Sequence, residues 1–120
     1  MTTAVFDHPA CLEHDTGFQH PESPERLRAV LEALAKPEFS SLVRRTAHRV
    51  HRGQLLRVHD GEYVSGVLAD IPQSDRIDYE PTGTVLSPGS GEAALRAAGA
   101  LCAAVDAVAT GEVDNTFCAV

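Results

Sequence analysis

The chain has 120 residues, a formal net charge of −7 and an apolar fraction of 43%. Its ten basic residues and negative balance argue against a nucleic-acid-binding surface, which needs clustered Lys and Arg. The longest apolar run, residues 93–109, is interrupted by Arg96 and Asp106, so the sequence predicts no membrane span.

The chain contains three cysteines, an odd number, and none of them forms a C-x-x-C pair. Free thiols used as small core residues are typical of a reducing compartment. The N-terminal stretch MTTAVFDHPA has neither the basic nor the apolar segment of a secretory signal. The sequence therefore predicts a cytoplasmic protein, and its low aromatic content predicts a core of Ala, Val and Leu.

The N-terminal part predicts a short strand and a helix. Residues 4–6 form an apolar run, and a long polar loop follows up to Ser23. Ser23 as N-cap and Pro24 at the first helical position mark a helix start, and Pro37 ends that helix. Its core-facing residues recur at helical spacing: Leu27, Val30, Leu31 and Leu34.

The middle of the chain predicts irregular connections around one further helix. Five arginines between positions 44 and 57 are interpreted as a solvated connection rather than as a polyanion site. Residues 54–59 suggest one or two helical turns, and an amphipathic helix begins at the N-cap Asp60 and ends before Pro72. Residues 72–84 are polar and rich in turn residues, so a loop is expected there.

The last part predicts the longest helix and a closing strand. The helix opens at Ser87-Pro88, ends near Gly111 and confines its polar side chains to a face about 80° wide, which predicts burial on most sides. These polar residues are Glu92, Arg96, Asp106 and Thr110. Residues 115–120, NTFCAV, show no polar alternation and predict a strand covered on both faces.

Strands separated by helices indicate an α/β fold with a parallel sheet. A strand covered on both faces needs neighbouring strands and a second helical layer. The preceding residues supply only one or two further strands. We therefore expect the fold to be incomplete.

Motifs alone assign no chemistry to the chain. Six histidines are present, including an H-x-x-H at His48 and His51, but they lack the Cys partners or the H-E-x-x-H that indicate zinc. They are interpreted as loop and surface residues. Asp78 and Glu80 could bind a cation, orient a substrate or simply be solvated carboxylates, and Arg26 could reach either solvent or the base of a pocket.

Four stretches occur in the order in which one known family has them: HPESPERL at 20–27, LLRVHDGEYV at 55–64, LSPGSGEAALRAAGALCAAVDAVATGE at 86–112 and FCAV at 117–120. Together they resemble the N-terminal portion of the histone deacetylase family. The resemblance is strongest to bacterial class II-like members related to acetylpolyamine amidohydrolases and acetoin utilisation proteins. It implies the N-terminal part of an arginase-like and deacetylase-like three-layer fold, with residues 1–120 as one incomplete segment that ends before the catalytic histidines.

The family hydrolyses an acetylated amide with zinc-activated water, a histidine base and a tyrosine that polarises the carbonyl. The resemblance places all of these groups beyond residue 120. It therefore implies that this chain contains no catalytic or metal-binding residue and has no activity alone. For the complete enzyme it implies a bound zinc ion and an acetyl-lysine-like or acetyl-polyamine substrate. Three alternatives stay open. The chain could be a naturally short, non-catalytic binding module for a partner or an acetylated ligand, a remnant of a degraded deacetylase gene, or an arginase-like hydrolase. The sequence does not indicate the oligomeric state.

Few site residues carry over from the family. Arg26 matches the family arginine that lines the internal channel beneath the active site, where acetate is thought to leave, and His20 and Pro21 would shape the channel wall. A guanidinium suits this role because it stays charged and holds a carboxylate in a bidentate fork. Relatives also carry an acidic residue at the substrate rim, for which Asp78 or Glu80 would substitute.

Overall fold

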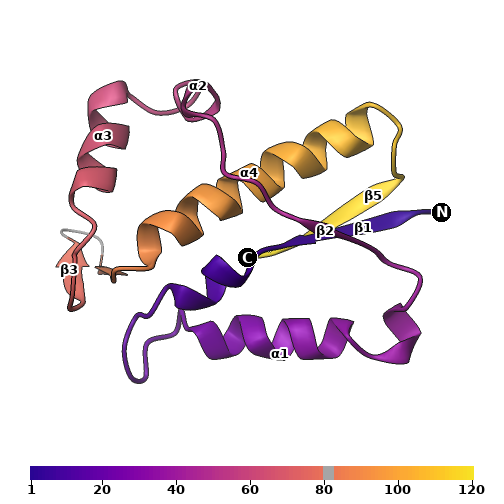
Figure 1. Cartoon of the computed structure of the whole chain (residues 1–120), viewed down its shortest axis with the longest axis horizontal. Helices are drawn as coiled ribbons and strands as arrows, with labels where there is room; N and C mark the ends of the chain where they lie inside the picture. Colours follow the sequence, from indigo (N-terminus) through magenta and orange to yellow (C-terminus); the bar gives the residue numbers. More distant parts are fainter. Residues whose placement is uncertain (80–82) are drawn as a thin grey trace.

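The computed structural model describes residues 1–79 and 83–120 and shows three layers (Figure 1). The middle layer is a parallel sheet with strand order β2-β1-β5, in which β1 spans Thr3–Asp7, β2 spans Val43–Thr46 and β5 spans Asn115–Ala119. Helix α1 (Pro24–Leu34) covers one face of the sheet, and α4 (Ser90–Ala109) covers the other. The predicted α/β class with a parallel sheet is confirmed.

Strand β1 lies at the centre of the sheet and is buried on both faces. Ala4 and Phe6 pack in the cluster that faces α4, whereas Val5 packs in the cluster that faces α1. Successive strand residues point to opposite faces, so a continuous apolar run suits a strand with a helix on each side.

Helix α4 lies close to the neighbouring backbone because its contact positions are Ala and Gly. The Val50 amide donates to the Leu95 carbonyl oxygen at 3.0 Å, which fixes the segment after β2 against the helix. A Cβ atom at Gly99 would overlap the His48 carbonyl oxygen and lie 2.8 Å from the Val50 nitrogen. Only glycine therefore fits at position 99 without movement of the backbone.

Two of the predicted helix starts are confirmed, whereas α4 begins at Ser90 after the N-cap Gly89, two residues later than the predicted start at Pro88. Helix α1 begins at Pro24 after the N-cap Ser23, and α3 (Gly61–Ala69) begins after Asp60, whose Oδ1 accepts from the Glu62 amide at 2.8 Å. The remaining helical pieces are short: η1 (Pro9–Glu13), η2 (Pro37–Phe39) and α2 (Arg52–Leu55). None of the helices among the described residues has the length and apolarity needed to cross a bilayer.

Two predicted connections are wrong, because they contain strands. The expected loop at 72–84 contains β3 (Ile77–Tyr79) and the first residue of β4 (Thr84–Leu86), and the two strands pair antiparallel. Most of β2 lies in the expected solvated connection. It is an edge strand, and its two arginines make the segment resemble a polar loop in the sequence. The Arg45 guanidinium lies 5.8 Å from the centre of the Phe6 ring and pairs with Glu112 at 2.6 Å.

The last helix and strand are only partly buried in this chain, as the expected incomplete fold requires. Leu101 and Val105 of α4 are 55% and 65% exposed, and Phe117 of β5 is 48% exposed. Together with Val108 they line an open apolar groove, which we call the α4–β5 face. The physical reason is that α4 packs on the sheet with one side only, and no described element covers the other side of this face.

Replacing Gly99 by Ala tests the close approach of α4. We expect Gly99→Ala to lower the free energy of unfolding by about 1–3 kcal/mol, because overpacking outweighs the gain of about 1 kcal/mol in helix propensity. Urea unfolding followed by circular dichroism measures the change. Gly66→Ala is the matched control, since nothing lies within 4 Å of its added Cβ. Equal stability of the two variants would contradict the packing.

Candidate functional site

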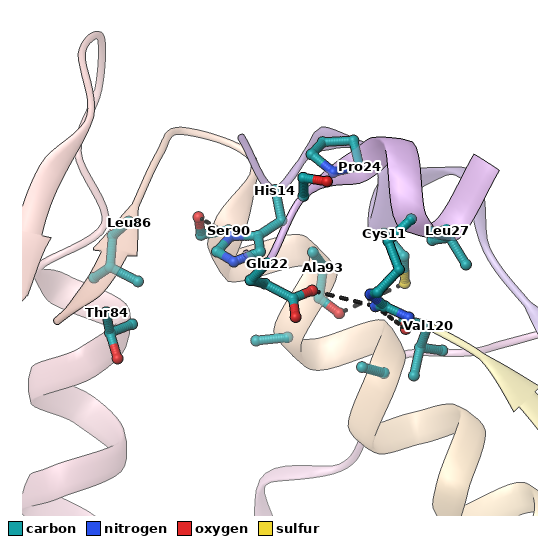
Figure 2. Close-up of a pocket in the computed structure, with 14 residues that line it drawn as sticks. Cys11, His14, Glu22, Pro24, Leu27, Thr84, Leu86, Ser90, Ala93 and Val120 are labelled. Carbon is teal, nitrogen blue, oxygen red and sulfur yellow. Dashed lines mark hydrogen bonds and ion pairs between the residues drawn. The ribbon is translucent and has the colours of Figure 1, made fainter. Parts of the chain in front are cut away.

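A cavity of about 300 Å³ lies at the carboxyl edge of the sheet (Figure 2). Its walls come from η1, the start of α1, the first half of α4, strand β4 and Val120, which follows β5. Ligands of open parallel α/β sheets bind outside the carboxyl ends of the strands. The position of the cavity therefore makes it the leading candidate for a ligand site.

Small apolar side chains leave the space in the cavity. Ala93, Ala94 and Ala97 of α4 line one side, and Leu27 and Leu86 lie around them. Because α4 presents only alanines over slightly more than one turn here, its wall of the cavity has no bulky side chain. The resulting surface suits a small ligand with an apolar part.

Cys11 lies in the same wall and is a neutral thiol. Its Sγ lies 3.8 Å from the Ala93 carbonyl oxygen, in reach of a weak S–H donation. Burial raises the pKa of the Cys11 thiol, the nearby Asp7 carboxylate raises that pKa further, and Arg96 opposes the shift. A thiol whose pKa is raised is a poor nucleophile and a poor metal ligand at neutral pH.

Arg26 supplies the positive charge at the cavity. Its Nη2 donates to Glu22 Oε1 at 3.2 Å and to the main-chain oxygen of Val120 at 3.1 Å. The side chains of Arg26 and Glu22 are 48% and 52% exposed, respectively. Glu22 and Arg26 are four residues apart at the start of α1, a spacing that brings their side chains together. The helix start at Pro24 thus sets where the guanidinium lies.

A polar network closes the other end of the cavity. His14 Nδ1 lies 2.7 Å from Ser90 Oγ, and Ser90 Oγ accepts from the Ser87 amide at 2.8 Å. Ser87 Oγ accepts in turn from the Asp15 amide at 3.0 Å. Both serines are buried, and these bonds pair their hydroxyl groups within the protein. The network fixes the loop after η1 to the start of α4.

The other predicted site residues lie elsewhere. His20 faces a neighbouring hollow and Pro21 is exposed, so of the predicted channel residues that the structure describes, Arg26 is the one in the cavity wall. Asp78 is exposed on β3, and its backbone pairs with Val85. Glu80 falls outside the described residues.

Sequence reasoning did not place Glu22, His14 and Ser90 in a site. Glu22 carries a usable local signal, because it precedes the helix start by two residues and stands four positions before Arg26, close enough for an ion pair. The contact between His14 and Ser90 joins positions 76 residues apart. No local pattern in the sequence predicts such a contact.

Within residues 1–79 and 83–120, no three His, Cys, Asp or Glu side chains lie close enough together to hold one metal ion. The H-x-x-H pair, His48 and His51, has ring centroids 6.1 Å apart. The described residues therefore do not fit a zinc site, and no zinc-dependent step is assigned to them.

Comparisons with known proteins agree on one family. A family model for the histone deacetylase domain matches residues 20–120. The chain is 33% identical to Histone deacetylase 5 of Arabidopsis thaliana over 94% of its length, and 27% identical to Type-2 histone deacetylase 2 of Dictyostelium discoideum over 99%. The crystal structure of the HDA15 HD domain superposes on the whole chain with a TM-score of 0.86 and 28% identity.

The chain is much shorter than these proteins. It spans 18% of the Arabidopsis protein, 8% of the Dictyostelium protein and 35% of the solved domain. The similarity thus covers all of this chain but only part of each relative.

The loop after η1 yields a prediction on pH. Asp15 accepts from the Gly17 amide at 3.0 Å and pairs with Arg76 at 2.7 Å, and these bonds lower the pKa of the Asp15 carboxyl, the Gly17 amide most. Because the pKa of Asp15 is lower in the folded chain, the ionised carboxylate stabilises the loop at pH values above about 3.9, the ordinary pKa. This contribution is lost as the pH falls through the lowered pKa. We expect Arg76→Gln to raise the pKa of Asp15 only part of the way to its ordinary value, because the bond from the Gly17 amide remains. Carboxyl NMR titration measures this pKa.

The control for this titration is Arg28→Gln, because Arg28 pairs with Glu25 instead, at 2.9 Å. It should leave the pKa of Asp15 unchanged. A pKa of Asp15 that returned fully to the ordinary value in Arg76→Gln would show that the Gly17 amide does not hold the carboxylate.

Proposed function

We propose that this chain, which belongs to the histone deacetylase family, forms the N-terminal part of a zinc-dependent deacetylase domain that hydrolyses an acetylated lysine-like or polyamine amide. Membership of the family and the superposition on the solved HDA15 HD domain support the proposal. The observation that carries this chain's own part in it is the Arg26 guanidinium in the wall of the cavity at the carboxyl edge of the sheet.

Hydrolysis of an acetylated amine yields an amine and acetate, and the cavity suits acetate. A guanidinium presents N–H groups in a planar fork that matches the two oxygens of a carboxylate. The methyl group would lie against the alanines of α4. Water takes about 30 Å³ per molecule in the liquid, so the cavity has room for acetate together with several water molecules. We assign acetate binding during product release to Arg26.

Zinc, when bound in the complete domain, activates water and polarises the amide carbonyl. The described residues do not fit a zinc site, so we assign hydrolysis to parts of the domain that this chain does not contain. The present residues supply the first strands of the sheet, two helical layers and the cavity wall.

The α4–β5 face supports an assembly with further parts of a domain. Leu101, Val105 and Phe117 are each about half exposed or more, and β5 is an edge strand of the sheet. An apolar face beside a free strand edge is typical of a surface that another segment covers. In the proposed domain, a further strand pairs with β5 and a further layer covers α4.

Activity assays test the first part of the proposal. We expect the purified chain, with zinc added, to release no acetate from an acetyl-lysine peptide or from N-acetylputrescine above a buffer blank, because no described residues assemble a metal site. Turnover that depends on zinc and stops on chelation would contradict this assignment.

Acetate binding tests the second part. We expect sodium acetate to bind the chain weakly, with a millimolar Kd by NMR titration, and Arg26→Gln to weaken binding at least about tenfold through loss of charge-assisted bonds. Arg28→Gln removes an equal charge from the same helix outside the cavity and should leave the Kd unchanged. Equal weakening by both variants would show a general charge effect rather than a site at Arg26.

A further inference from the structure

We infer that the Glu22 carboxylate is an internal competitor for the carboxylate that Arg26 binds, and that it keeps the cavity's affinity for acetate low. The inference rests on the proposed function, because it concerns the same cavity. It assigns a role in product release to a residue outside the hydrolytic step.

The contacts place one carboxylate on the guanidinium already. Glu22 Oε1 lies 3.2 Å from Arg26 Nη2, and Glu22 itself lines the cavity (Figure 2). This carboxylate has the same charge, shape and acceptor oxygens as acetate. Acetate that reached Nη2 would have to displace it or share the nitrogen with it and with the main-chain oxygen of Val120.

In this chain, exposure makes the pair displaceable. About half of each side chain is exposed, and half-exposed ion pairs are weak because water and salt screen them. A group tethered close to its partner nevertheless acts at an effective concentration in the millimolar range. Such a competitor is matched to a ligand that binds with millimolar affinity.

The backbone of Glu22 is anchored while its carboxylate reaches the cavity. The Thr16 hydroxyl donates to the Glu22 carbonyl oxygen, and the Glu22 amide donates to His20 Nδ1 at 3.1 Å. Pro24 fixes the helix start two residues later. The side chain can therefore turn away from Arg26 and return without movement of the backbone. Its return would replace departing acetate on the guanidinium.

The experiment is a titration of the ¹⁵N-labelled chain with sodium acetate at constant ionic strength. The Arg26 Nε–Hε signal and the Leu27 and Ala93 amides report on the cavity. We expect Glu22→Gln to lower the Kd for acetate about two- to fivefold, the effect of losing a weak tethered ion-pair competitor. The melting temperature of the variant should stay unchanged, since a structural defect would lower it.

Glu25→Gln is the matched control. Glu25 lies in the first turn of α1, three residues after Glu22, but its carboxylate pairs with Arg28 at 2.9 Å, away from the cavity. The two variants lose equal charge, so an effect of the chain's net charge alone would shift both Kd values alike. We expect Glu25→Gln to bind acetate as the unaltered chain does.

The outcomes separate the inference from the proposed function. If Arg26→Gln abolishes binding and Glu22→Gln does not tighten it, or tightens it no more than Glu25→Gln does, the competitor role is overturned and the acetate site stands. If acetate binds none of the chains, or binds without regard to Arg26, both the site and the competitor are overturned.

Discussion

The close packing of α4 against the sheet and the segment after β2 is the constraint on which the rest of the structure depends. Ala100 and Ala104 pack in the same cluster as β1, and Gly99 lets the backbone of residues 48–50 cross the helix directly. This contact holds the first half of α4 at the carboxyl edge of the sheet. There Ala93 forms part of the cavity wall. The same choice of small residues therefore builds the core and leaves the space for a ligand.

The cavity joins parts of the chain that are far apart in sequence. Arg26 is fixed by the start of α1, His14 by the loop after η1, and Ser90 by the start of α4. The parallel sheet brings them together because β1 and β5 both end at this edge. The position of the site thus depends on the topology of the sheet. Its chemistry depends on Arg26, whose ion-pair partner, Glu22, itself carries a carboxylate.

Local signals in the sequence predicted the helices well, because prolines and caps act within one turn: Ser23-Pro24 and Asp60 are examples. They failed for β2 and for the β3–β4 hairpin, whose short strands are charged or polar and gain their structure from partners elsewhere. The family resemblance, not a motif, singled out Arg26. The contact between His14 and Ser90 had no sequence signal, since tertiary packing alone creates it.

The central claim is that the carboxyl edge of the sheet and Arg26 form a site for a small carboxylate. A crystal structure of the chain, from crystals grown in sodium acetate, tests this claim most directly. The account predicts acetate in the cavity with its oxygens on the Arg26 guanidinium and the Glu22 carboxylate turned away. An acetate-free cavity in which Arg26 stays paired with Glu22, or an Arg26 side chain that points into solvent, would contradict it.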